Sequence, residues 1–253
     1  MKPKNLTEIQ KSFTTQSQNH VAYSKGAFDY TVQVMDLTKD DCVLDAAAGT
    51  CAFARAAAPF VKTVVCLDAT PAMLAAGKEE AAKSGITNIQ FINGYVDEIP
   101  FDDEYFDIVF TSNAFHHFTE MEKPFSEMHR VLKRGGQLVI KDMEATEENL
   151  REIEDKIETM RDPSHVKNRS RYEFLELYEK YGYTVKKQEF SIFPKSLTDW
   201  LALTKTPDEV SEEIKNMLKA EMQNGSSTGF RPYLQGGEIY FEQRFVFFIG
   251  IKA

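Results

Sequence analysis

Two carboxylates in this chain stand where binding chemistry is expected, each at the end of an apolar run. Asp45 precedes the small-residue segment Ala46-Ala47-Ala48-Gly49-Thr50, and Asp68 ends the next apolar run, 23 residues later. A turn of small residues lets a ligand approach the backbone, and a helix that starts after it points free N–H groups at that ligand. A carboxylate placed like Asp68 can accept two hydrogen bonds from a ribose diol. The pair predicts a nucleotide-type ligand; a strand-end or N-cap role for Asp68 is the alternative.

The adjacent histidines His116 and His117 are the best candidates for acid–base chemistry, since a neutral imidazole can accept a proton near pH 7. Adjacent side chains seldom point the same way, so we expect one of them, His117, to enter the pocket. The alternative is that both hydrogen-bond the surrounding loop. Neither has a carboxylate or cysteine partner at ligand spacing, so the sequence predicts no metal site.

A second polar cluster follows at Arg161, Asp162 and His165. Arg161 could hold a substrate carboxylate through two hydrogen bonds, and His165 could act as another base. A helix end followed by a solvated turn is the alternative interpretation. Aromatic residues elsewhere, Phe118 and Trp200 among them, could line an apolar chamber for a small ligand.

Strands and helices alternate around these residues, which indicates an α/β fold with a parallel sheet covered on both faces. The expected strands are 41–46, 63–68, 88–94, 106–112 and 137–141, with helices at 50–59, 71–84 and 120–133. After residue 142 we expect helices at 147–160, 171–181, 196–203 and 207–224, and strands at 183–193 and 238–251. One or two helices should precede residue 41. The two late strands suggest a sheet that ends in a hairpin, with the segment between them acting as a cap.

Composition bounds the function. The chain has 253 residues, of which 42% are hydrophobic and 27% charged, as expected for a globular protein with a sizeable core. A net charge of −9 argues against nucleic acid as a partner. The sequence shows no signal peptide and no membrane-spanning run. Cys42, Cys51 and Cys66 are expected to be small hydrophobic residues in a reducing compartment, so we expect a cytoplasmic protein.

A set of motifs, each weak alone, lies in order between residues 40 and 142. They are Val43-Leu44-Asp45, the turn around Gly49, Asp68 to Leu74, Ile99-Pro100-Phe101, Phe106 to Val109, Phe115 to Phe118, and Val131 to Gly136. Together they resemble the class I S-adenosylmethionine-dependent methyltransferases, and most closely the ubiquinone/menaquinone C-methyltransferase-like branch. Residues 161–166 also look like a segment of a bacterial subgroup, which extends the likeness over most of the chain.

The resemblance implies a Rossmann-like, doubly wound, seven-stranded and mostly parallel sheet with an antiparallel last strand, plus helical cap elements. Residues 1–40 would form N-terminal cap helices and 41–145 the cofactor-binding core. Residues 146–253 would complete the sheet and carry helical substrate-cap insertions, all within one integrated domain. The implied function is in-line transfer of a methyl group from S-adenosyl-L-methionine to a small-molecule acceptor, leaving S-adenosyl-L-homocysteine. A monomer or homodimer is expected.

The resemblance also implies roles for single residues. Ala47 and Gly49 would face the methionine part of the cofactor, Asp68 would hold the ribose, and Met73 and the Val96 N–H would meet the adenine. The full cofactor-binding set comprises Tyr23, Asp45, Ala46, Ala47, Gly49, Asp68, Ala69, Met73, Tyr95, Val96, Asp97, Asn113 and Phe115. The substrate-binding set comprises Phe118, Arg161, Arg169, Tyr172 and Trp200, and the catalytic candidates are His117, His116 and His165.

Four residues depart from the family pattern; one of them, Arg134, stands where proline is common and should matter only locally. Ala47 and Cys51 replace two of the three alternating glycines of the turn. Alanine costs little if φ stays negative, whereas Cys51 should narrow the pocket or shift the backbone. Tyr95 stands where an aspartate often accepts from the adenine, a task that Asp97 could take over. These changes leave open a non-catalytic protein that binds S-adenosylmethionine or S-adenosylhomocysteine. A nicotinamide-dependent oxidoreductase fits poorly, because its glycine fingerprint is largely missing.

Overall fold

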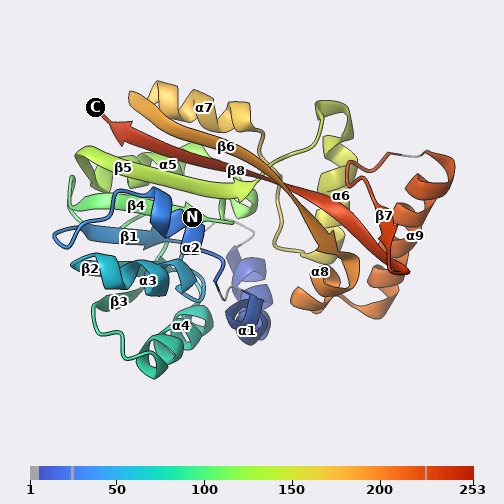
Figure 1. Cartoon of the computed structure of the whole chain (residues 1–253), viewed down its shortest axis with the longest axis horizontal. Helices are drawn as coiled ribbons and strands as arrows, with labels where there is room; N and C mark the ends of the chain where they lie inside the picture. The colour runs from blue at the N-terminus through green and yellow to red at the C-terminus, as the bar shows by residue number, and fades with distance from the viewer. Residues whose placement is uncertain (1–5, 24–25, 226) are drawn as a thin grey trace.

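The computed structural model describes residues 6–23, 26–225 and 227–253, without the side chains of Leu6, Glu8 and Tyr23. Its sheet has the strand order β3-β2-β1-β4-β5-β8-β6 (Figure 1). The strands are β1 Cys42–Ala46, β2 Thr63–Asp68, β3 Ile89–Asn93, β4 Phe106–Ser112, β5 Leu132–Met143, β6 Tyr183–Ser196 and β8 Glu238–Lys252. The first five pair in parallel, and β8 runs antiparallel between β5 and β6. The predicted fold class is therefore confirmed.

Helices cover both faces of this sheet. The helices of the described residues, in the core and in the rest of the molecule, are α1 Leu6–Tyr23, α2 Asp29–Val34, α3 Ala52–Ala57, α4 Pro71–Lys83, α5 Glu122–Val131, α6 Arg151–Arg161, α7 Arg171–Lys180, α8 Leu197–Leu203 and α9 Asp208–Asn224. Short 3-10 turns occur at η1 Ala58–Phe60, η2 Phe115–His117 and η3 Glu148–Leu150. No helix in the described ranges combines the length and apolarity needed to cross a membrane.

The strand order places the ligand crevice. From β1 the chain first builds outward through β2 to β3 and then returns to the other side of β1 for β4, so the connections diverge between β1 and β4. Asp45 lies beside Cys66 of β2 and Phe110 of β4 in the strand registers. In open parallel sheets, ligands bind outside the carboxyl ends of the strands at this divergence.

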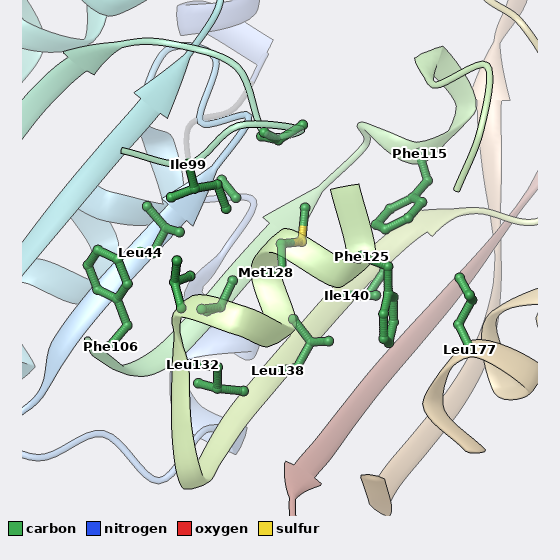
Figure 2. Close-up of a cluster of buried hydrophobic side chains, with 14 of the residues drawn as sticks. Leu44, Ile99, Phe106, Phe115, Phe125, Met128, Leu132, Leu138, Ile140 and Leu177 are labelled. Atoms are coloured by element: carbon green, nitrogen blue, oxygen red, sulfur yellow. The ribbon is translucent and has the colours of Figure 1, made fainter. Parts of the chain in front are cut away.

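Two apolar clusters hold the sheet to its helices. On one face, Leu44, Phe106 and Ile140 pack with Phe125 and Met128 of α5 (Figure 2). On the other face, the second cluster gathers buried side chains of α2, α3, α4 and the sheet, namely Val32, Val43, Phe53, Val64, Leu74, Ile108 and Phe110. Burial of apolar surface at about 25 cal/mol per Å² makes these clusters the main source of stability.

Strands β6 and β8 continue beyond the core into a second lobe that holds α6, α8 and α9 (Figure 1). We call this lobe, residues 147–170 and 196–242, the cap. It has its own apolar cluster, which includes Ile157, Trp200, Ile214 and Phe241. Arg244 of β8 ties the cap to the sheet through a buried ion pair with Glu154, 2.8 Å between Nη2 and Oε1.

Two details differ from the sequence prediction. An eighth, three-residue strand, β7 Tyr233–Gln235, pairs with β8 in the cap. Strand β5 begins at Leu132 instead of residue 137, because Lys133–Gly136 forms a bulge between the pairs Phe106–Leu132 and Ile108–Gln137. Gly136 is required there, since a Cβ would lie 2.7 Å from the carbonyl oxygen of Asp107.

Candidate functional site

The turn after β1 takes a left-handed backbone at every second residue. Ala47, Gly49 and Cys51 have φ values of 57°, 54° and 55°. The condition under which alanine would cost little, a negative φ, is therefore not met at Ala47. Cys51 does not narrow the pocket either, because its side chain is fully buried and its sulfur contacts the carbonyl oxygen of Gly49 at 3.6 Å. The backbone path typical of a glycine-rich turn is kept although two of the residues are not glycine.

Asp68 fixes this turn. One carboxylate oxygen accepts the Gly49 N–H at 2.7 Å, and the other accepts the Thr70 N–H at 2.8 Å. Asp45 lies nearby and accepts the Ala54 N–H of α3 at 3.3 Å. Burial raises the pKa of both carboxyls, that of Asp45 to about 8. Two buried carboxylates thus meet at the start of the crevice.

A cavity of about 760 Å³ opens at these carboxyl ends and extends to the cap. Roughly 300–1,000 Å³ is typical for sites that enclose small molecules. Its wall includes fifteen residues named from the sequence: Asp45, Ala47, Gly49, Asp68, Ala69, Met73, Tyr95, Val96, Asp97, Asn113, His116, His117, Phe118, Arg161 and Trp200. Residues placed in separate sets by the sequence interpretation therefore share one cavity.

Five of the predicted site residues do not line the cavity, and three of them belong to the core or to the outer surface. Ala46 is fully buried within β1. Phe115 points into the apolar cluster beside Phe125 and Ile140 (Figure 2), and it meets the ring of Phe174 at 5.3 Å. Tyr172 lies on the outside of α7 and is 70% exposed.

His165 and Arg169 are buried behind the cavity wall. His165 Nε2 lies 2.9 Å from Asp155 of α6. Arg169 donates to the carbonyl oxygen of Phe118 at 2.5 Å. Both residues support the segment that carries the histidine pair, but neither reaches the cavity. The side chain of Tyr23 lies outside the described part of the structure.

The histidine pair occupies the 3-10 turn η2, and both imidazoles line the cavity. Their ring centroids are 4.1 Å apart. The expectation that a single histidine enters is wrong, because this tight turn brings the two rings to the same side. His116 Nδ1 lies 2.7 Å from Asp142 Oδ1, and His117 Nδ1 lies 3.1 Å from the carbonyl oxygen of Ser164. Burial and the neighbouring His116 lower the pKa of His117 to about 3.

The segment 161–166 closes over this pair from the cap. The Ser164 hydroxyl lies 3.2 Å from His117 Nδ1 and donates to Asp162 Oδ1 at 2.7 Å. The same Asp162 oxygen accepts from Ser12 of α1 at 3.2 Å. Phe13 of α1 adds a ring contact to His117, with centroids 5.2 Å apart. Helix α1 and the cap segment 161–166, about 150 positions apart in the chain, therefore complete the surroundings of one imidazole.

Arg161 is held differently from the prediction. Its Nε donates to the carbonyl oxygen of Trp200 at 3.0 Å, and its guanidinium lies 4.4 Å from the Trp200 ring centroid. Glu158 lies 3.4 Å from Nη1. A two-bond clamp that uses Nε is therefore not available, and the Nη atoms are the ones left for a ligand.

Sequence reasoning missed several residues of this site. Asp142 lies at the carboxyl end of β5, where the rule that identified Asp45 and Asp68 could have found it. Ser112 at the end of β4 lines the cavity, and its buried hydroxyl has no hydrogen-bond partner among the described residues. Gln243 and Phe245 of β8 also line it. The sequence could not predict this, because it does not show that β8 lies next to β5. Among the described residues, no group of three or more His, Cys, Asp or Glu side chains is placed to hold a metal ion.

Comparison with known proteins identifies the family. A family model described as Methyltransferase domain matches residues 44–140, which include the turn, Asp68 and the histidine pair. The protein YafE of Escherichia coli (strain K12) is 30% identical over 178 residues, 70% of this chain and 84% of YafE. The methyltransferase YcgJ of Bacillus subtilis (strain 168) is 29% identical over 212 residues, 83% of this chain and 84% of YcgJ. The crystal structure of YcgJ matches with a TM-score of 0.81 at 27% identity, covering 92% of this chain and 99% of that one.

The chain belongs to the class I S-adenosylmethionine-dependent methyltransferases. Its cofactor is S-adenosyl-L-methionine, and its reaction is methyl transfer. The ubiquinone/menaquinone biosynthesis C-methyltransferase UbiE of Proteus mirabilis (strain HI4320) is 33% identical over 116 residues, 44% of this chain and 46% of UbiE. The predicted family and its relation to UbiE are confirmed. This methyltransferase resembles YcgJ over a larger share of its length than it resembles UbiE.

Proposed function

We propose that this methyltransferase transfers the methyl group to a small-molecule acceptor held between the histidine pair and the cap. The observation that carries the proposal is the single cavity that joins the turn after β1 to Trp200 of α8. A cofactor in the turn and an acceptor under the cap would then share one enclosed space. The volume of about 760 Å³ suits a compact acceptor and not a folded macromolecule.

The cavity wall offers suitable partners for the cofactor. Each Asp68 oxygen already accepts one N–H and has a further lone pair for a ribose hydroxyl. A Cβ on Gly49 would lie 3.3 Å from Met73 Cε, so a larger residue in the turn would press on the side chain that we assign to the adenine. The unpartnered Ser112 hydroxyl is another polar group in the wall. We assign the ribose to Asp68, the adenine to Met73, Val96 and Asp97, and the methionine part to Ala47, Gly49 and Asn113.

The cofactor supplies an electrophilic methyl group on a sulfonium. The chain has to bring an acceptor into line with that methyl group and to keep water away, because alignment is the main source of rate in such displacements. The part of the wall near the cap is largely apolar and includes Phe13, Met143, Trp200, Leu203 and Phe245. This lining favours an acceptor with a flat or apolar body.

The test is a binding and turnover experiment on the purified chain. We expect S-adenosylhomocysteine to bind in the micromolar range by calorimetry, and NADH not to bind. S-Adenosylhomocysteine should form when methyl-labelled S-adenosylmethionine is offered with a panel of small acceptors. Absence of heat with either form of the cofactor would overturn the proposal. Binding without product across a broad panel would instead support the non-catalytic alternative.

A further inference from the structure

We infer that His116 is the general base of methyl transfer, that Asp142 positions it, and that the acceptor therefore attacks through an atom that carries a proton. The inference rests on the proposed function and narrows it to acceptors with an O–H, S–H, N–H or acidic C–H group. His117 then serves as a neutral wall and positioning residue.

The contacts of Asp142 carry the first step. Its Oδ2 accepts the N–H groups of Ala114 and Phe115, both at 2.8 Å. Its Oδ1 accepts the Met143 N–H at 2.8 Å and meets His116 Nδ1 at 2.7 Å. A carboxylate only accepts, so Nδ1 of His116 carries the hydrogen and Nε2 is the nitrogen left to take a proton. The fixed carboxylate thus sets the tautomer that a base requires.

The rest of His116 is held equally firmly. Its carbonyl oxygen accepts the N–H groups of Val166 and Lys167 at 2.9 and 3.1 Å. The His165 ring stacks on its imidazole, with centroids 5.7 Å apart and planes 28° apart. A base that is held on both sides needs little reorganisation when the acceptor arrives.

His117 is less suited to accept the proton. Its Nδ1 contacts the carbonyl and hydroxyl oxygens of Ser164, and Asp162 is reached only through that hydroxyl. Its pKa of about 3, lowered by burial, agrees with a histidine that stays neutral. Burial alone would raise the pKa of Asp142, but His116 and the backbone N–H groups outweigh it and keep that pKa below its usual value.

The step balances without another reactant. The proton of the acceptor group X–H passes to Nε2 of His116, and the electron pair on X forms the new bond to the methyl carbon. The pair of the broken carbon–sulfur bond stays on sulfur, which becomes the neutral thioether of S-adenosylhomocysteine. The imidazolium, stabilised by Asp142, later releases its proton to solvent. A tertiary amine or thioether has no proton to give, so the dyad would have no role with those acceptors.

The rate should fall at acid pH as the dyad becomes protonated. The charged and titratable groups around His116 come from several elements: Asp142 of β5, His117 of η2, Asp155 of α6, and Asp162, His165 and Arg169 of residues 161–169. These groups affect the pH at which the rate of methyl transfer is half its maximum. Removal of the His116 imidazole, and not of these neighbours, should abolish the decrease in rate at acid pH, which we call the acid limb.

The experiment compares His116→Gln and Asp142→Asn with the wild type and with His129→Gln, a control on α5 whose imidazole contacts Tyr183 outside the cavity. The protic probes are catechol, 4-methoxyphenol and thiophenol, and the aprotic probes are N,N-dimethylaniline and thioanisole. We expect transfer from methyl-labelled S-adenosylmethionine to protic probes alone. His116→Gln should lower kcat/KM by about 10²–10⁴-fold and remove the acid limb, and Asp142→Asn should have a smaller effect in the same direction.

Two further readouts separate chemistry from folding. Affinity for S-adenosylhomocysteine should stay within about threefold of the wild-type value in every variant, which would show that the cofactor-binding turn after β1 is intact. Nitrogen NMR of the cofactor-free protein should show His116 with hydrogen on Nδ1, and Asp142→Asn should change this tautomer preference. Equal turnover of protic probes by wild type and His116→Gln overturns the inference, as does failure of the wild type to methylate any protic probe while it binds the cofactor. Failure to bind the cofactor at all would instead overturn the proposed function.

Discussion

Two parts of the cavity are built in different ways. We call the turn after β1 with Asp45 and Asp68 the cofactor cradle, and the histidine pair with segment 161–166 and the cap the acceptor side. In the cradle, Asp68 contacts a residue 19 positions away, and Asp45 one only 9 away. On the acceptor side, His117 meets Ser164 across 47 positions, and Ser12 meets Asp162 across 150. The cradle is a local unit of backbone geometry, whereas the acceptor side exists only when both ends of the chain and the cap have assembled. Changes on the acceptor side can therefore alter the acceptor while the cradle is preserved.

The largest effect should come from the cap. Trp200 is 4% exposed and packs against the rings of Phe230 and Phe241. Trp200→Ala should lower the free energy of unfolding by about 3–5 kcal/mol and raise the acceptor KM, while the folded fraction keeps its affinity for S-adenosylhomocysteine. Urea titration and calorimetry measure the two quantities. Tyr172→Ala, at an exposed aromatic, should change stability by less than about 0.5 kcal/mol. Loss of cofactor affinity in Trp200→Ala would erase the distinction between the two regions.

The converse variant acts on the cradle. Asp68→Ala removes the acceptor of the Gly49 and Thr70 N–H groups together with the proposed ribose partner. An unpaired buried polar group costs about 1–3 kcal/mol, so affinity for S-adenosylhomocysteine should fall by about 100-fold or more, as calorimetry would show. Asp103→Ala removes an exposed carboxylate that is paired with Arg130 and should have no effect. A drop of less than tenfold in Asp68→Ala would show that the ribose is held elsewhere.

The buried carboxyl of Asp45 gives the cradle a pH dependence. Its pKa of about 8 lies above the ordinary value of 3.8 because of burial. A raised carboxyl pKa contributes stability that is complete below about pH 4 and is lost as the pH rises to 8, at up to about 1.4 kcal/mol per pH unit. Asp45→Asn should remove this loss in the cofactor-free protein, so its stability relative to wild type should increase from pH 4 to pH 8. Denaturation curves at four pH values test the sign, and a parallel pH profile for both proteins would contradict it.

A smaller effect is expected from the hydroxyl that joins Asp162 to His117. Ser164→Ala removes this link and should cost about 1 kcal/mol of stability. It should also lower kcat by about tenfold, with unchanged affinity for S-adenosylhomocysteine. Ser126→Ala, at an exposed hydroxyl that bonds within its own helix, is the matched control. If Ser164→Ala lowers the affinity for S-adenosylhomocysteine instead, the hydroxyl contributes to the cofactor cradle.

The smallest effect concerns the left-handed alanine. A φ of 57° at Ala47 costs an L-residue about 1–2 kcal/mol, and the added freedom of glycine in the unfolded chain offsets about 0.4–1 kcal/mol. Ala47→Gly should therefore stabilise by less than about 1 kcal/mol and leave cofactor affinity unchanged. Ala56→Gly, inside helix α3, should destabilise by about 1 kcal/mol. Chemical denaturation of both variants measures the change in the free energy of unfolding, which should be positive for Ala47→Gly and negative for Ala56→Gly.

The contrast between the regions explains what the sequence could predict. Apolar runs that end in Asp45 and Asp68 gave both the parallel strands and the crevice, because a buried parallel strand has a recognisable composition. The partners of the histidines could not be found in this way. Nothing along the chain shows that His116 meets Asp142 or that His117 meets Ser164. Tyr172 was assigned to the pocket from its aromatic character and its place shortly after the polar cluster at 161–165, but the helix presents it to solvent.

The two long strands β6 and β8 have a mechanical consequence. They run from the sheet into the cap, over 14 and 15 residues, and pair with each other along that span, with one register shift between Val185 and Lys187. This ribbon joins the cap to the sheet through two hydrogen-bonded strands. Under the proposed function, the ribbon sets the distance between the turn after β1 and an acceptor held under the cap. It therefore limits the length of acceptor that the cavity can hold.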